Sequence, residues 1–373
     1  MPGAGPIRLV VVQPTPFCNI NCSYCYLTRR NDRARMSMEV IDAVGQSILA
    51  SPLAATDVSV VWHAGEPTMV PIAWYERAFS QLATVPGVRL HHSFQTNGVA
   101  VNSDWIDLWR RWNVRVGVSI DGPREINDRH RRTRGDRGSF DAAINGLRRL
   151  RESGYPFHVI SVLTRSSLEQ PDELMDFYLS EGITYVCFNV EEEEGEHRTS
   201  SLAVESDASA AYAAYLRRFV KRMQTDQQAP RCREVDAVTS LITAGVEARR
   251  HNPQVNPLEI VSVAVNGDMS TYSPELMGVR SDRFNNFIFG NVLTHPVEAI
   301  LEHPAFLELR DEIERGISAC EKTCPYFGVC GGGAPSNKFF EHRTCASTET
   351  LYCRLTRKAV INAVLPELEA AYA

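Results

Sequence analysis

Short runs of hydrophobic, often β-branched residues alternate with longer amphipathic segments through the first half of the chain. The short runs have the length and composition of strands, and the longer ones carry hydrophobic residues at helical spacing. Strands are expected at 7–13, 57–62, 88–95, 114–120, 157–163 and 184–190, with helices at 37–50, 71–83, 103–112, 140–153 and 171–180. This alternation predicts an α/β fold with a parallel sheet of βα units, and it is equally compatible with a barrel and a doubly wound sheet.

The alternation of strands and helices is interrupted near residue 233. A connecting helix and a proline-bearing loop at 251–257 lead to a strand at 258–265 and the turn Asn266-Gly267-Asp268. We therefore expect a first domain, a linker and a second domain, with the boundaries 1–232, 233–257 and 258–373.

Composition narrows the class of protein. The 373 residues are 44% hydrophobic and 23% charged, as is usual for a globular protein, and the net charge of −6 argues against nonspecific binding of nucleic acid. No apolar run approaches the ~20 residues of a membrane span, and the amino terminus lacks the features of a signal peptide. We expect a cytoplasmic protein with no membrane and no nucleic-acid partner.

Ten cysteines are many for such a protein, and eight of them fall into two groups near the two ends. The first group is Cys18, Cys22 and Cys25, spaced C-x3-C-x2-C directly after the first expected strand. A zinc site would normally be closed by a fourth ligand, and a disulfide framework would leave one cysteine over. Three crowded thiolates favour an iron–sulfur cluster with one iron open to an outside ligand.

This spacing, its place after a first strand and the aromatic Tyr24 before the last cysteine resemble the radical S-adenosylmethionine (radical SAM) family. The resemblance implies a partial (β/α)6 barrel in which the three cysteines hold a [4Fe–4S] cluster and SAM binds the open iron. One electron from that cluster then cleaves SAM to a 5′-deoxyadenosyl radical. An electron donor such as flavodoxin or ferredoxin is implied as a partner.

Later strand ends resemble the SAM-binding segments of this family in the same order along the chain. The family's Gly-Gly-Glu-Pro segment is here Ala64-Gly65-Glu66-Pro67, with alanine in place of the first glycine. The segments at 95–98 and 119–123 resemble those that line the SAM pocket, and by spacing Arg131, with Arg132 as the alternative, is the arginine that pairs with the SAM carboxylate. The other residues of the basic run 126–132 are expected in a solvated loop. The implied SAM-binding residues are Ala64, Gly65, Glu66, Gln95, Asn97, Ser119, Asp121 and Arg131.

The second cysteine group lies near the carboxyl end and has the pattern C-x3-C-x5-C followed by three glycines. Its members are Cys320, Cys324 and Cys330, with Cys353 or Cys345 as the fourth ligand. One four-thiolate iron–sulfur cluster fits this density, and a structural zinc is the alternative.

This module resembles the SPASM extension of radical SAM peptide maturases, whose full form carries two auxiliary clusters. The residues at two expected cysteine positions are here Tyr272 and Ala334. The resemblance therefore implies that one auxiliary cluster has been lost and that the other is held by Cys320, Cys324, Cys330 and most plausibly Cys353. We expect two [4Fe–4S] clusters in all.

Four further segments, at 12–22, 270–275, 290–292 and 330–337, resemble the GrrM/OscB-type cyclophane-forming maturases. These enzymes join an aromatic ring carbon to the β-carbon of a nearby residue in a ribosomally made precursor peptide with a leader sequence. The first strand begins close to Met1, so we expect the leader to bind the barrel, the SPASM surface or a partner protein. Crosslinking releases one proton, for which Glu275 is a positional candidate. The run Glu191 to Glu194 follows the sixth expected strand and is expected to be solvated. The alternative is that it docks a basic leader peptide, since its position is over the barrel mouth.

Two alternatives remain open. Other SPASM reactions, namely formylglycine formation on sulfatases, thioether formation and epimerisation, use the same cofactors. A metal-stabilised peptide-binding protein without turnover would instead hold zinc and release no 5′-deoxyadenosine.

Overall fold

The computed structural model describes residues 4–204 and 207–372, and its centre is one continuous sheet. The spatial order of the strands is β10-β9-β8-β1-β2-β3-β4-β5-β6-β7. Their bounds are β1 Ile7–Val12, β2 Ala54–Trp62, β3 Arg89–Thr96, β4 Arg115–Ser119, β5 Phe157–Leu163, β6 Tyr185–Val190, β7 Arg231–Cys232, β8 Ile260–Val263, β9 Asp268–Thr271 and β10 Gly290–Asn291.

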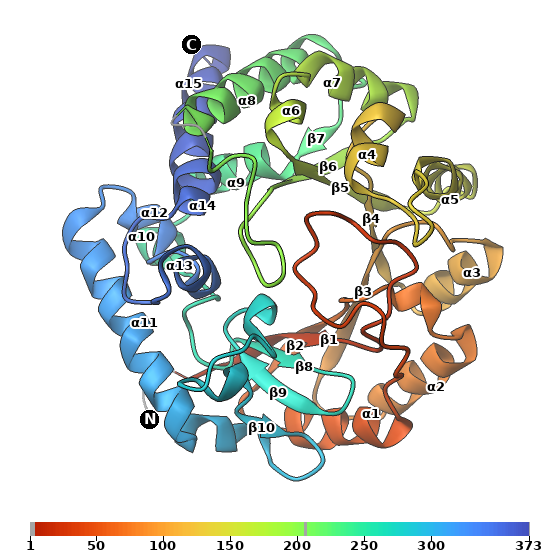
Figure 1. The fold of residues 1–373 in the computed structure, drawn as a ribbon, viewed down its shortest axis with the longest axis vertical. Coiled ribbons are helices and arrows are strands. Elements are labelled where there is room, and N and C mark those ends of the chain that lie inside the picture. The colour runs from red at the N-terminus through yellow and green to blue at the C-terminus, as the bar shows by residue number, and fades with distance from the viewer. Residues whose placement is uncertain (1–3, 205–206, 373) are drawn as a thin grey trace.

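Strands β1 to β7 are parallel neighbours, and the sheet curves so that its helices lie outside (Figure 1). The sheet ends at β7 on one side and β10 on the other, so the barrel is partial. The helices are α1 Met38–Val44, α2 Ile72–Leu82, α3 Ser103–Arg111, α4 Arg124–His130, α5 Phe140–Glu152, α6 Arg165–Leu168, α7 Pro171–Ser180, α8 Ala208–Thr225, α9 Arg233–Thr243, α10 Val246–Arg250, α11 Pro304–Thr323, α12 Phe327–Cys330, α13 Pro335–His342, α14 Leu351–Cys353 and α15 Val360–Tyr372.

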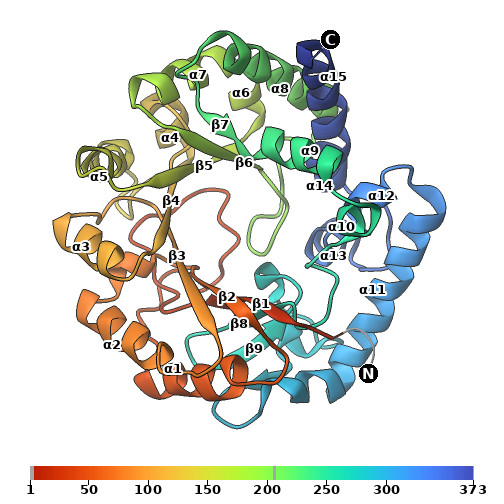
Figure 2. The ribbon, with the colours of Figure 1, turned by 180° about the vertical axis from the view of Figure 1, so that it is seen from behind.

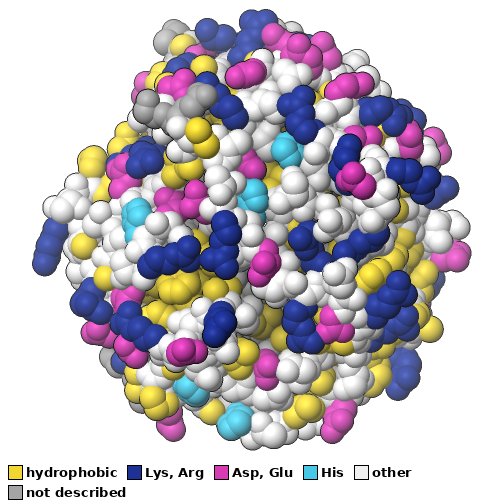
Figure 3. All heavy atoms as spheres, viewed as in Figure 1, with side chains coloured by type: hydrophobic (Ala, Val, Ile, Leu, Met, Phe, Trp, Pro, Cys, Tyr) yellow, Lys and Arg dark blue, Asp and Glu magenta, His cyan; other side chains and the backbone are white. Residues whose placement is uncertain are grey.

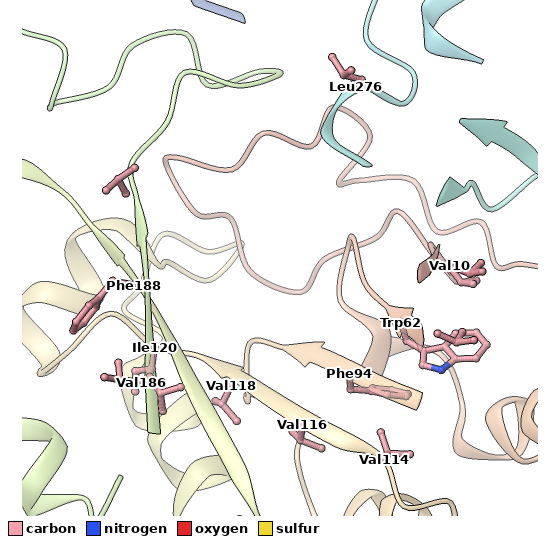
Figure 4. Packing of buried hydrophobic residues seen from close by; sticks show 14 of the residues in the cluster. Val10, Trp62, Phe94, Val114, Val116, Val118, Ile120, Val186, Phe188 and Leu276 are labelled. Carbon is pink, nitrogen blue, oxygen red and sulfur yellow. The ribbon is translucent and has the colours of Figure 1, made fainter. Parts of the chain in front are cut away.

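The core lies between the sheet and its helices. Side chains of a strand alternate between its two faces, so Phe94, Val116 and Val118 pack outward, as Figure 4 shows, while the residues between them face the barrel interior. Trp62 of β2 meets Tyr75 of α2 edge-on, with ring centroids 5.4 Å apart. This outward packing leaves the polar ends of the strands free to line the interior.

The carboxy-terminal segment continues the same sheet. Strand β8 pairs in parallel with β1, and β9 and β10 add to it as antiparallel strands. Helix α15 returns to pack against α8 and α9, and both views of the ribbon show it beside α8 (Figures 1 and 2). The expected boundaries at 232 and 257 fall at the end of β7 and after α10, and they stay a prediction.

Two local expectations differ from the structure. The helix expected at 37–50 is α1 followed by a π-helical turn, Gly45–Leu49. The expectation of a loop within 126–132 is wrong, because helix α4 runs to His130. Pro123 precedes this helix, Glu125 lies in its first turn and Arg129 in its last. This order of charges is favourable in the field of the helix dipole. Among the residues described, no helix is long and apolar enough to cross a membrane.

Candidate active site

The loop that follows β1 brings Cys18, Cys22 and Cys25 to one cavity of about 480 Å³, which we call the central cavity. Its walls are the carboxyl ends of β1 to β6, the edge where parallel barrels place functional residues. Burial raises the pKa of the Cys18 thiol to about 12 and that of Cys22 to about 11, although Arg131 opposes the rise at Cys22. Without metal these thiols are protonated at neutral pH, so metal binding must displace their protons.

The segment after β2 is fastened to the cysteine loop by its backbone. Ala64 and Gly65 both have positive φ angles, +68° and +64°, and the Glu66 amide donates to the Phe17 carbonyl oxygen at 2.8 Å. A Cβ atom at Gly65 would lie only 2.7 Å from the same oxygen and would also overlap the Thr15 carbonyl oxygen. The left-handed backbone at Ala64 explains why glycine suits that position in the family motif.

Glu66 organises the ends of β2 and β3. Its Oε1 accepts hydrogen bonds from Thr68 N, Thr68 Oγ1 and Thr96 Oγ1, at 3.0, 2.6 and 2.8 Å. Within the part of the chain that the structure describes, its Oε2 accepts one hydrogen bond, from Asn97 N at 2.8 Å, so a lone pair of this oxygen is left for a ligand. Burial raises the pKa of the Glu66 carboxyl, and the four hydrogen bonds oppose that rise.

The next two strand ends face the same space. Gln95 Nε2 donates to Ser119 Oγ at 2.7 Å, which ties β3 to β4. Asn97 Nδ2 donates to Asn19 Oδ1 at 2.7 Å and lies 3.8 Å from Cys18 Sγ. These amides therefore connect the first cysteine to the strand ends.

Arg131 lies in the cavity wall, whereas Arg132, the alternative, is exposed and pairs with Asp136. Arg131 is 6% exposed; its Nε lies 3.0 Å from Asp121 Oδ1, and its Nη1 is 4.0 Å from Cys22 Sγ. Asp121 also accepts from Tyr24 Oη and from Val162 N. Of the eight predicted SAM-binding residues, seven line the central cavity; Asp121 lies behind Arg131 and holds it there.

The acidic run after β6 folds back over the barrel, so the expectation of a solvated run is wrong. Glu192 and Glu194 line the central cavity together with Glu275, and Asn337 Nδ2 donates to Glu192 at 2.5 Å. Burial raises the pKa of all three carboxyls, to about 7 for Glu192, and Glu275 adds to the rise at the other two. The sequence placed this run over the barrel mouth but did not assign Glu192 and Glu194 to the site, because a charge run alone does not reveal which tertiary surface covers it.

The second cysteine group forms a separate cavity of about 90 Å³, which we call the auxiliary cavity; its cysteines are Cys320, Cys324, Cys330 and Cys353. Cys345 is not among its lining residues: it is 1% exposed, and its Sγ donates to the Pro335 carbonyl oxygen at 3.6 Å. Cys320, Cys330 and Cys353 lie in helices α11, α12 and α14, and Cys324 directly follows α11. Four thiols around one small cavity form a donor set that suits an iron–sulfur cluster.

Tyr272 and Ala334, which stand where the full SPASM pattern has cysteines, are buried in the core. Tyr272 is fully buried and stacks on Phe306 with ring centroids 5.9 Å apart, and Ala334 is 5% exposed. An aromatic side chain thus occupies the place of one expected thiolate.

Comparison with known proteins agrees with this architecture. The sequence profile of the Radical SAM superfamily matches residues 12–178. The uncharacterized protein sll1766 of Synechocystis sp. is 38% identical over 372 residues, which cover 98% of this chain and 93% of that protein. The chain belongs to the radical SAM superfamily, and S-adenosylmethionine and iron–sulfur clusters are its cofactors.

More distant relatives are peptide- and protein-modifying enzymes. The serine-type anaerobic sulfatase-maturating enzyme of Bacteroides thetaiotaomicron is 28% identical over 212 residues, about half the length of each chain (53% of this one and 51% of that one). Among solved structures, native anSMEcpe with bound AdoMet and Cp18Cys peptide superposes with a TM-score of 0.77 at 18% identity, covering 98% of this chain and 99% of that chain. Streptococcus suis SuiB bound to precursor peptide SuiA gives 0.65 at 18% identity, covering 93% and 76%. These structures share the fold of the whole described chain.

Proposed function

We propose that this radical SAM enzyme matures a ribosomally synthesised precursor peptide by forming a cyclophane, a C–C crosslink between an aromatic ring carbon and the β-carbon of a nearby residue. One observation carries the proposal: segments that resemble the cyclophane-forming maturases, around Glu275 and Asn337, line the same cavity as Cys18, Cys22 and Cys25. Substrate, SAM and cluster would therefore meet in one space.

Each predicted residue has a role in holding the cofactors. Cys18, Cys22 and Cys25 would hold the [4Fe–4S] cluster, Glu66 Oε2 and the backbone of Ala64 and Gly65 would accept from the SAM amino group, and Arg131 would pair with its carboxylate. Gln95, Asn97 and Ser119 would line the rest of the SAM pocket. When bound, these cofactors supply a 5′-deoxyadenosyl radical that removes one hydrogen atom from the substrate β-carbon.

Crosslinking removes two hydrogens from the peptide. One leaves as the hydrogen atom, and the other leaves the aromatic ring as a proton and an electron. Glu275 is the candidate proton acceptor, because its Oε2 is enclosed and has no hydrogen-bond partner among the described residues, and because burial raises the pKa of its carboxyl, which favours proton uptake. The electron would go to an auxiliary cluster held by Cys320, Cys324, Cys330 and Cys353.

The partners follow from the same arrangement. A second cavity of about 270 Å³ shares Tyr26, His63 and Glu275 with the central cavity, which offers a route for an extended peptide. The SuiB and anSMEcpe structures, which hold peptides, support a peptide substrate. A reductant such as flavodoxin or ferredoxin would supply the electron that cleaves SAM. On the face shown in Figure 3, Lys and Arg side chains are spread among Asp and Glu side chains.

The decisive experiment is anaerobic incubation of the reconstituted enzyme with its cognate precursor, SAM and reductant, read by tandem mass spectrometry. A cyclophane predicts loss of two hydrogens and no fragmentation between the linked residues. Release of 5′-deoxyadenosine without a crosslink would overturn the cyclophane but not the radical SAM chemistry. Zinc in place of iron, with no 5′-deoxyadenosine, would instead indicate a peptide-binding protein without turnover.

Sulfatase maturation is the second candidate, because the Bacteroides enzyme and anSMEcpe resemble this chain. It predicts an aldehyde on the product that reacts with a hydrazide probe, which a cyclophane does not. Thioether formation requires a substrate thiol and is stopped by thiol alkylation, and epimerisation leaves the mass unchanged.

A further inference from the structure

Lys338 of α13 extends its side chain to the back of the auxiliary cavity. The residue is 3% exposed, and its Nζ lies 3.6 Å from Cys320 Sγ, within hydrogen-bond range for sulfur. Two glycines leave room for it: a Cβ atom at Gly316 would lie 3.1 Å from Nζ, and one at Gly333 would lie 3.6 Å from Cε. The missing side chains of Gly316 and Gly333 thus leave the space in which the Lys338 side chain reaches the Cys320 sulfur.

A buried ammonium requires a negative partner. Among the residues that the structure describes, no carboxylate forms an ion pair with Lys338, and its one side-chain hydrogen-bond acceptor is the Cys320 sulfur. An isolated buried charge is strongly unfavourable. The group placed to complement Lys338 is therefore the Cys320 sulfur, which carries a negative charge once it binds metal.

We propose that Lys338 is a positioning residue that donates a hydrogen bond to the auxiliary cluster and raises its reduction potential, so that the cluster accepts the electron released by crosslinking. Hydrogen bonds to cluster sulfurs and nearby positive charge stabilise the reduced form, which carries one more negative charge. The balance is one electron from the substrate ring, which takes the cluster from the 2+ to the 1+ state. This inference rests on the auxiliary cluster of the proposed function.

Lys358 provides a matched control in the same chain. It also lines the auxiliary cavity, but its Nζ pairs with Glu349 and its side chain is 24% exposed. The carboxylate and solvent already offset its charge. A lysine that acts by contact and burial should therefore affect the cluster far more than this one.

The test is a potentiometric titration of the reconstituted full-length enzyme, followed by electron paramagnetic resonance. The auxiliary signal is the one that SAM does not perturb. Lys338→Met should lower the reduced-to-oxidised ratio at a fixed potential about tenfold, ~59 mV for a one-electron couple. Lys338→Arg should retain most of the wild-type potential, and Lys358→Met should change it much less than Lys338→Met does.

Iron content separates the two hypotheses. Wild-type enzyme with about four iron atoms would refute the auxiliary cluster itself. The role of Lys338 alone would be refuted if wild type and Lys338→Met both held about eight iron atoms and had the same auxiliary potential. Equal shifts of that potential in Lys338→Met and Lys358→Met would also refute it. Should Lys338→Met lose auxiliary iron, Lys338→Gln is compared with Lys338→Arg, and equal potentials for that pair would overturn the proposal.

Discussion

Arg131 carries a charge that two partners need at once. It pairs with Asp121, which is 1% exposed, and it also lines the central cavity, where the SAM carboxylate is proposed to bind. An arginine already fixed by a buried aspartate loses little conformational freedom on binding a second carboxylate. The ion pair also gives Asp121 a role: Asp121 does not line the cavity itself but holds Arg131 in the cavity wall.

Replacing Arg131 with methionine should therefore destabilise the apo-protein and weaken SAM binding. We expect a loss of roughly 3–5 kcal/mol in the free energy of unfolding, because Asp121 is left buried and unpaired. Urea denaturation and equilibrium binding of SAM to the reconstituted enzyme measure the two effects. Arg132→Met is the control, since Arg132 pairs with Asp136 at the surface and should cost less than about 1 kcal/mol. Equal effects of the two variants would contradict this assignment.

At the scale of elements, the segment Ala64–Pro67 after β2 packs tightly against the loop that carries Cys18, Cys22 and Cys25. A change in one of these two segments should therefore disturb the other. Gly65→Ala should cost roughly 2–5 kcal/mol, the sum of a left-handed backbone and overlap with the Phe17 carbonyl group. It should also reduce iron incorporation at the first cluster. Ala64→Gly relieves a positive φ and should change stability by no more than about 1 kcal/mol. Thermal unfolding and iron analysis of both variants check the prediction, and a Gly65→Ala protein with full iron content would contradict it.

The acidic segment that folds over the barrel makes stability depend on pH. Glu192 has a pKa of about 7 in the folded protein, raised by burial above its ordinary value of 4.5, so the folded state holds a proton that the unfolded state has lost between these pH values. Stability should therefore fall as pH rises through this window. Glu192→Gln should be more stable than wild type by on the order of 3 kcal/mol at pH 8 and equal to it at pH 4. Urea denaturation of the apo-proteins at the two pH values tests this; a variant that is less stable at pH 8 would show that the ionised carboxylate is well paired.

The local elements were predictable where local physics decides them. The strand and helix alternation from 7 to 190 follows from hydrophobic periodicity, and β1 to β6 lie where they were expected. The SAM-binding residues came from the resemblance to the radical SAM family. Seven of those eight line one cavity, and their role in binding SAM stays a prediction. The fold-back of Glu192 and Glu194 was not predictable, because it depends on contact with Asn337, far along the chain. Lys338 was missed because its burial depends on Gly316, which lies on another helix, as well as on the nearby Gly333.

At the scale of the whole molecule, the chain joins its two cysteine groups through one sheet and a returning helix. Strand β8 beside β1 and helix α15 against α8 hold the carboxy-terminal segment on the barrel. The three helices that supply the auxiliary cysteines, α11 with its cap residue, α12 and α14, are therefore placed by contacts that span the chain. Chain distance alone could not choose between Cys345 and Cys353, whereas their positions in the fold separate them.

Those positions predict opposite outcomes for two alanine variants. Cys353→Ala removes a thiol from the auxiliary cavity and should lower iron from about eight to about four atoms per chain. Cys345→Ala removes a packed thiol outside that cavity and should keep about eight, with a modest loss of stability. Iron analysis after reconstitution is the measurement.

Cys324→Ala should lower the iron content as Cys353→Ala does. It should also abolish the crosslink while retaining some SAM cleavage, because the first cluster is intact and the substrate electron has lost its acceptor. An unchanged crosslink yield in Cys324→Ala would assign that electron to another acceptor.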